Sequence, residues 1–222
     1  EIDALTSDAI VTNTSSRNGS NDYKQDFERE LAKISGNIGI DLGIKMFVTT
    51  SDNQSFENIN KTVNIKRIKK RLKFYNRKLS KKKHGSNNYY RLLKKKNALD
   101  KRLSNKRKEY YKNVANTLVK AKPEFIALEY ISVKDMLKNR GLSDKISEMN
   151  FYNFRLYLEQ KAKENNIAIR YVDRYFPSSK TCSCCGSVKD KLKLSERVFK
   201  CDCGFEIDRD LNAAINIKNF AG

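Results

Sequence analysis

Cysteine residues near the C-terminal end of the sequence have the spacing of a metal site. All five cysteines lie between residues 182 and 203, and four of them form a CxxC pair and, 15 residues later, a CxC pair. Two tight turns that each present two thiolates can satisfy the tetrahedral coordination of Zn²⁺, and Gly186 and Gly204, directly after the pairs, allow such turns. The predicted zinc ligands are Cys182, Cys185, Cys201 and Cys203.

The fifth cysteine, Cys184, is left over, and the sequence leaves open whether it replaces one of its neighbours as a ligand. An odd and clustered set of cysteines fits a metal site better than a framework of disulfides. Reduced thiols persist in a reducing compartment, so we expect the protein to work in one.

Positive charge is concentrated in one segment of the chain. Residues 66–122 hold 23 Lys and Arg against two acidic residues, Asp100 and Glu109, while the whole chain has a formal net charge of +20. The entire excess therefore lies in this segment, which predicts a surface for a polyanion such as DNA or RNA and not a site for a small molecule. The candidate contacts are Lys69, Lys70, Lys81, Lys82, Lys94, Lys95, Lys106 and Arg107.

Three acidic residues occupy unusually apolar settings: Asp41 in GIDLGI, Glu129 in IALEY and Asp210 in DRDLNAAINI. A buried carboxylate is costly unless it is paired or binds a cation. Each has a structural alternative, namely a turn cap for Asp41, an ion pair with a lysine for Glu129, and a first helical turn behind an Asp208 N-cap for Asp210. In a chain that binds a polyanion, the three together favour a phosphodiester-cleaving site with two Mg²⁺ ions, which prefer oxygen ligands.

Several other classes of protein lack the residues they need. His84 is the only histidine and lies in the polar stretch KKKHGSNN, where we expect an exposed loop, so a His-based nuclease or a tyrosine transposase with a His-rich metal site is not supported. The sequence has no GxxxxGK phosphate loop, and no apolar run approaches the roughly 18 residues of a membrane span. Tyrosines 89, 90, 110 and 111 lie among the lysines and suit either base stacking or helix packing.

The elements that must position these residues follow from apolar periodicity. Residues 37–50 alternate around two glycines, which predicts two short strands joined by a tight turn. Residues 125–130 indicate a buried strand, and residues 167–172 indicate a further strand. Apolar residues at helical spacing predict long basic helices over 65–79 and 99–118, separated near 85–88 and ended by Pro123. Further helices are expected over 151–162 and 212–217, so the fold class is mixed α/β.

Four stretches of the sequence are recognisable together. They are GIDLGIK (39–45), IALEYISVKDMLKNRGLSDKISEMNFYNFRLYLEQKA (126–162), VDRYFPSSKTCSCCG (172–186) and FKCDCGFEIDRDLNAAINI (199–217). They resemble the C-terminal half of TnpB/OrfB proteins, the transposon-encoded relatives of type V CRISPR effectors. The likeness runs from about residue 37 to 219, and the block FPSSKTCSxCG followed by DRDxNAAxNI is its most specific part.

The resemblance implies a RuvC nuclease domain of RNase H-like fold over residues 37–219, with a basic helical hairpin (66–122) and a zinc ribbon (180–205) inserted. It aligns Asp41, Glu129 and Asp210 with the three carboxylates that bind magnesium in that family. The function it implies is RNA-guided, Mg²⁺-dependent cleavage of DNA, with DNA and a transposon-encoded guide RNA as partners.

One departure from the family concerns the N-terminal half, which in such proteins binds the guide RNA. Only 36 residues precede the domain here, and they include the Ser/Asn-rich run 12–21, which indicates a linker or a remnant of an N-terminal domain. We therefore expect a chain truncated at its N-terminus, either a fragment or a shortened reading frame. The alternative function is a catalytically idle nucleic-acid-binding module. Either function predicts a cytoplasmic protein associated with a prokaryotic nucleoid.

Overall fold

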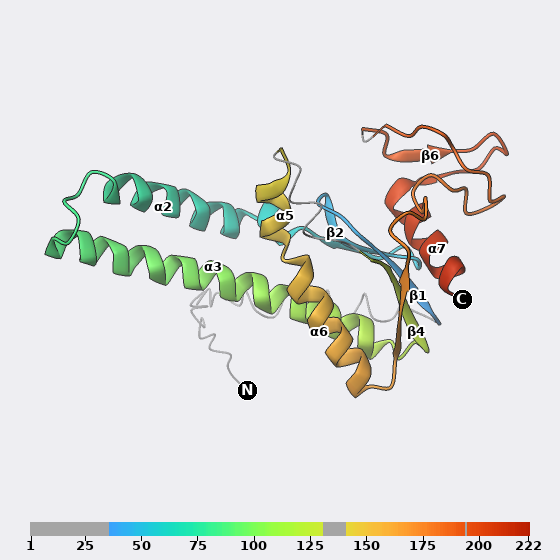
Figure 1. Ribbon diagram of the computed structural model, residues 1–222, viewed down its shortest axis with the longest axis horizontal. Coiled ribbons are helices and arrows are strands. Elements are labelled where there is room, and N and C mark those ends of the chain that lie inside the picture. Colours follow the sequence, from blue (N-terminus) through green and yellow to red (C-terminus); the bar gives the residue numbers. More distant parts are fainter. Residues whose placement is uncertain (1–35, 131–140, 194) are drawn as a thin grey trace, which may run out of the picture.

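A computed structural model describes residues 36–130, 141–193 and 195–222, so residues 1–35 of the expected linker lie outside it. The described chain is a mixed α/β structure built on one five-stranded sheet (Figure 1). Its strands are β1 (Ile38–Leu42), β2 (Met46–Thr50), β3 (Ser55–Glu57), β4 (Phe125–Glu129) and β5 (Ala168–Val172). They are ordered β3-β2-β1-β4-β5; β2 is antiparallel to both β1 and β3, whereas β4 is parallel to both β1 and β5.

Alternating side chains separate the two faces of this sheet. Ile38 and Ile40 of β1 are fully buried in the main core, which is covered by α3 (Asn87–Lys120) and α6 (Phe151–Glu164). The opposite face carries α7 (Arg209–Ala221), where Ala127 of β4 packs with Ile217. Figure 1 shows α7 and the α3–α6 pair on opposite sides of the sheet. The sheet is therefore the middle layer of three.

The predicted basic helices form a long hairpin of α2 (Val63–Leu79) and α3 that extends away from the sheet (Figure 1). Thr62 and Ser86 cap the two helices, their side chains accepting hydrogen bonds from the backbone N–H groups of Ile65 and Tyr89. The apolar stripe predicted from the sequence forms a small core of its own, made of Ile65, Ile68, Leu72, Leu99 and Leu103. At about 1.5 Å per residue, the 34-residue α3 is about 50 Å long.

The basic segment is nevertheless not a separable appendage. The last three turns of α3 bury Tyr111, Val114 and Leu118 in the main core beneath the sheet. One continuous helix thus belongs to both cores, which makes the hairpin a rigid extension of the domain.

Several short elements were not predicted from the sequence. They are β3, the 3₁₀ helix η1 (Ile59–Lys61) and α5 (Ser143–Met149), each too short to show a clear periodicity. The cysteine region adds a two-stranded sheet of β6 (Val198–Lys200) and β7 (Glu206–Asp208). Among the described residues, no helix is long and apolar enough to cross a membrane.

Candidate functional site: a carboxylate cluster, a thiol cluster and a basic hairpin

Two of the three acidic residues lie at the carboxyl ends of neighbouring parallel strands. The register pairs Ile40 of β1 with Leu128 of β4, so Asp41 and Glu129 are the next residues in line. Both lie two positions after a residue of the α7 face, Gly39 and Ala127 respectively, and side chains repeat every two residues in a strand. Asp41 and Glu129 therefore share the face of the sheet that α7 covers.

Helix α7 carries the third carboxylate to the same place. A Cβ atom at Gly39 would lie 2.6 Å from the backbone nitrogen of Lys218 and would clash with the backbone oxygen of Ala214, so α7 rests directly on β1. At the other end, Gly222 approaches Phe125 at the start of β4. The helix thus runs antiparallel to these strands, and its first turn, which contains Asp210, lies at their carboxyl ends.

The pKa of Asp41 responds to the other two carboxylates. The pKa of Asp41 is raised from 3.8 to about 7, first by burial and then by the charges of Asp210 and Glu129, against the opposing effect of Arg209. Burial also raises the pKa of Glu129. A cation bound among neighbouring carboxylates stabilises them, because it offsets the repulsion between their negative charges. Their oxygen donors are the type that Mg²⁺ prefers.

Asp208 has a different local role. Its carboxylate accepts hydrogen bonds from the backbone N–H groups of Asp210, at 2.9 Å, and Leu211, at 3.2 Å, and so caps α7. The N-cap alternative considered for this part of the sequence is correct for Asp208. Asp210, in the first turn, is left with its carboxylate near Asp41.

The four cysteines chosen from the sequence lie together. The Sγ atoms of Cys182, Cys185, Cys201 and Cys203 all lie within 4.8 Å of one another, and this group does not include Cys184. Gly186 and Gly204 adopt the positive φ angles of 76° and 86° that the two turns require. The hydrogen bonds of Ser187 lower the pKa of Cys185 to about 6, toward the thiolate form that binds metals. The cluster can hold a metal ion such as zinc.

Buried amides join this thiol cluster to α7. Asn212 accepts a hydrogen bond from the backbone N–H of Ser183, at 3.1 Å, and donates one to the carbonyl of Thr181, at 2.7 Å. Asn216, one turn later, donates to the carbonyls of Ser178 and Thr181. Both asparagines are buried. They were not singled out from the sequence, although their i, i+4 spacing within an apolar helix is a signal that could have indicated this role. The helix that carries Asp210 is thereby anchored to the cysteine region.

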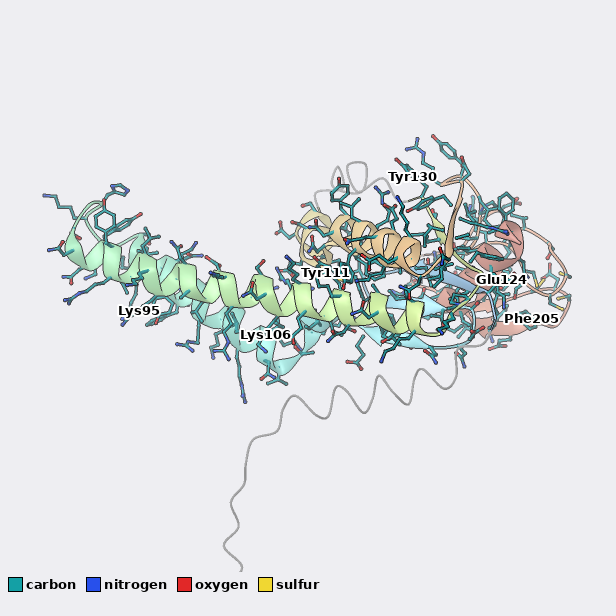
Figure 2. All side chains as sticks on the ribbon, turned by 90° about the horizontal axis from the view of Figure 1, so that it is seen from below. Lys95, Lys106, Tyr111, Glu124, Tyr130 and Phe205 are labelled. Atoms are coloured by element: carbon teal, nitrogen blue, oxygen red, sulfur yellow. The ribbon has the colours of Figure 1, made fainter. Side chains whose placement is uncertain are left out.

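Most of the predicted nucleic-acid contacts lie on the surface of the hairpin. Figure 2 shows Lys95 and Lys106 on the part of α3 that extends from the sheet. Lys70, Lys81, Lys82, Lys94 and Lys95 are exposed, whereas Lys106 is half-buried. A groove of about 570 Å³ between the helices is lined by Lys69, Lys70, Lys73 and Asn76 among others.

Two of the predicted contacts have partners inside the protein. Glu148 of α5 forms ion pairs with Lys69, at 2.5 Å, and with Arg107, at 3.5 Å. Arg107 also donates a 2.7 Å hydrogen bond to the side chain of Asn60, and burial lowers the pKa of its guanidinium. These two cations fasten the hairpin to α5, a role that spacing along a helix could not reveal.

The tyrosines among the lysines differ in their exposure, so the two roles left open by the sequence, base stacking and helix packing, apply to different residues. Tyr111 lies in the core, and Tyr110 donates a hydrogen bond to the carbonyl of Glu57, so both serve packing. Tyr90 is half-exposed at the hairpin tip, and His84 is exposed there beside Tyr89, as predicted for a loop.

Comparison with known families identifies the chain. Residues 20–140 match the OrfB/IS605 family model, described as a probable transposase, and residues 151–217 match the TNB domain of Cas12f1-like proteins. The first match covers more than half of the chain, so the chain belongs to this TnpB/OrfB family.

Two relatives illustrate the similarity. A Streptomyces pristinaespiralis protein, provisionally named an RNA-guided DNA endonuclease, is 35% identical over 81% of this chain and 44% of its own length. TnpB-like protein L79 of Acanthamoeba polyphaga mimivirus is 32% identical over 53% of this chain and 23% of its own. The chain therefore spans less than half of the length of the first relative and about a quarter of the length of the second.

Solved structures share the fold. A Cas12f1–sgRNA–target DNA complex aligns with a TM-score of 0.58 at 22% identity, covering 82% of this chain and 49% of the other. A CRISPR-Cas12f ternary complex aligns with a TM-score of 0.61 at 26% identity, covering 84% and 40%.

Proposed function

We propose that this chain supplies the DNA-cleaving part of an RNA-guided endonuclease, a RuvC domain of RNase H-like fold with a zinc ribbon. The observation that carries the proposal is the gathering of Asp41, Glu129 and Asp210 on one face of the sheet, where their charges interact. The sheet order β3-β2-β1-β4-β5 is compatible with the RNase H-like fold that the sequence resemblance implies.

In this proposal the three carboxylates hold Mg²⁺ through their oxygen atoms. Two such ions would supply an activated water and stabilise the leaving oxygen of a phosphodiester. Asp208 keeps the first turn of α7 formed, and the contact at Gly39 keeps Asp210 over β1. Cys182, Cys185, Cys201 and Cys203 would hold a structural Zn²⁺, and through Asn212 and Asn216 the ribbon would brace the helix that bears Asp210.

The proposed partners are DNA and a guide RNA. The names of the relatives and the nucleic acids in the aligned complexes support them, as does the charge of the hairpin. The alternative, a module that binds nucleic acid without cleaving it, predicts the same binding and no use for the carboxylates. A protein with these partners belongs with the chromosome in the cytoplasm.

Magnesium binding tests the site in the chain as it stands. We expect Mg²⁺ to bind the wild type in calorimetric titration and to bind Asp41→Asn, Glu129→Gln and Asp210→Asn far more weakly. Asp100→Asn is the matched control, because that carboxylate pairs with Lys96 on the hairpin. Equal binding by all four variants would contradict the proposal.

A cleavage assay needs the N-terminal half and the guide RNA of a longer relative. An N-terminal half and a guide RNA from such a relative are supplied with target DNA, and strand scission is followed on gels. The Asp210→Asn variant should lose cleavage and keep DNA binding. Tight, guide-dependent DNA binding by a wild type that binds Mg²⁺ yet never cuts would favour the idle module.

A further inference from the structure

We propose that a tyrosine patch beside the carboxylate cluster binds the unpaired bases of a single-stranded nucleic acid by stacking. The patch consists of Tyr130, Tyr152 and Tyr171 around Arg155. The inference deepens the proposed function, because the bound strand would be the one presented to Asp41, Glu129 and Asp210.

Three separate elements build the patch. Tyr130 directly follows β4, Tyr171 lies in β5, and Tyr152 and Arg155 lie on α6. The Arg155 guanidinium lies 5.5, 5.7 and 6.0 Å from the ring centroids of Tyr130, Tyr152 and Tyr171. The Tyr130 and Tyr171 rings meet edge to face with centroids 5.9 Å apart. The three rings thus surround one shared cation, within the distance of a cation–π interaction.

Exposure distinguishes these rings from core aromatics. Relative exposure is 50% for Tyr130, 52% for Tyr152 and 40% for Tyr171, whereas the side chain of Arg155 is only 20% exposed and pairs with Glu159. The cation is covered and the rings around it are open. Packing of α6 onto the sheet alone does not require three half-exposed aromatic rings at one place.

The position of the patch relative to the carboxylates follows from the strand. Tyr130 is the residue after Glu129, so the two Cα atoms are about 3.8 Å apart, and their side chains leave the strand on opposite sides. A 2.9 Å hydrogen bond from the Tyr130 N–H to the carbonyl of Val172 holds this end of β4 against β5. A chain that crosses the carboxyl end of β4 can therefore stack a base on Tyr130 while a neighbouring phosphate reaches Glu129.

The chemistry of the patch favours a single strand as its occupant. Tyrosine rings stack on any base, and unpaired bases expose the faces that a duplex hides. The positive charge of the hairpin draws a polyanion to the protein, and the carboxylates at the same end of β4, once they bear metal ions, suit a phosphodiester. A protein partner would need none of these features.

The test compares two single strands of equal charge. A twelve-residue oligothymidylate and an abasic strand of the same length are titrated against the whole chain without Mg²⁺, so a lack of cleavage does not affect the result. We expect the wild type to bind the oligothymidylate roughly tenfold more tightly. A Tyr130→Leu/Tyr152→Leu variant should lose this preference, and a Tyr130→Phe/Tyr152→Phe variant should keep it.

Controls make the outcome decisive. Phe220→Leu removes an equally exposed ring, at 59%, from the C-terminal end of α7 and should keep the preference. If the double leucine variant fails to fold, Tyr152→Leu alone is used, with melting as the check, and it should reduce the preference. Equal affinity of the wild type for both strands would overturn the inference and point to a protein partner. A preference that survives the leucine substitutions would also overturn it.

Discussion

The ionised carboxylate of Asp41 destabilises the fold unless it binds a cation or a proton. Its pKa is raised to about 7, first by burial and then by the charges of Asp210 and Glu129. Because the folded-state pKa lies above the ordinary value of 3.8, the folded protein binds this proton more tightly than the unfolded chain does. The contribution of Asp41 to stability is therefore most favourable below pH 4 and becomes unfavourable as the pH rises toward 7.

Substitution of Asp41 should accordingly stabilise the metal-free protein. In Mg²⁺-free buffer at pH 8, we expect Asp41→Asn to raise the free energy of unfolding by about 1–2 kcal/mol, with a smaller effect at pH 5. Added Mg²⁺ should raise the melting temperature of the wild type at pH 8 and leave that of the variant unchanged. Thermal melting at both pH values is the measurement, and a destabilised variant at pH 8 would show that the site is not strained by charge.

The neighbouring cysteines Cys184 and Cys185 provide a matched pair. Cys185 lies in the thiol cluster and has a pKa lowered to about 6 by Ser187, whereas Cys184 is exposed and outside the cluster. Cys185→Ser should lose zinc and Cys184→Ser should retain one ion per chain, as measured by elemental analysis of protein purified without chelator. The reverse pattern would mean that Cys184 is the ligand.

At the scale of elements, the contact between β1 and α7 decides where Asp210 lies. Gly39 leaves no room for a methyl group, because the two nearest obstructing atoms, the carbonyl oxygen of Ala214 and the nitrogen of Lys218, belong to the backbone of α7 and cannot rotate away. We expect Gly39→Ala to cost about 1–3 kcal/mol of stability and to weaken Mg²⁺ binding by displacing the helix. Unfolding in urea and magnesium titration are the two measurements.

Gly43→Ala serves as the comparison for Gly39→Ala. Its added Cβ would lie 3.1 Å from the carbonyl of Met46, within the turn between β1 and β2, and not against α7. It should therefore affect stability less and leave magnesium binding close to that of the wild type. If both variants weaken magnesium binding equally, α7 is not positioned by this contact.

In the whole molecule, the proposed nucleic-acid-binding surface and the proposed catalytic carboxylates lie in different places. The positive excess lies on the hairpin that extends from the sheet (Figure 1). The carboxylates lie on the face of the sheet that α7 covers. Because α3 runs from one core into the other, nucleic acid bound to the hairpin, as proposed, would lie in a fixed relation to the sheet.

The salt dependence of nucleic-acid affinity tests whether the hairpin lysines contact phosphate. Replacing Lys81, Lys82, Lys94 and Lys95 with glutamine should reduce the slope of log affinity against log salt by up to about 0.7 for each phosphate of single-stranded DNA that is no longer neutralised. All four lysines are exposed, so the melting temperature should not change. An unchanged slope with reduced affinity would mean that these lysines do not touch phosphate.

Local patterns in the sequence were sufficient to predict most of the elements and the candidate functional groups. Apolar periodicity located the long helices and four strands, since the 3.6- and 2-residue repeats are properties of local chain geometry. The cysteine spacing selected the four thiols that lie together, because short turns fix their relative positions. The apolar contexts of Asp41, Glu129 and Asp210 marked them as unusual, and the resemblance to TnpB/OrfB proteins indicated the family.

The contacts between residues far apart in sequence could not be predicted in this way. That Lys69 and Arg107 bind Glu148, that Asn212 and Asn216 anchor the thiol cluster, and that three tyrosines surround Arg155 depends on packing between elements far apart in sequence. The same holds for Gly39, whose lack of a side chain is needed only because α7 crosses it. Periodicity predicts which side of an element is buried, but it does not predict which other element packs against that side.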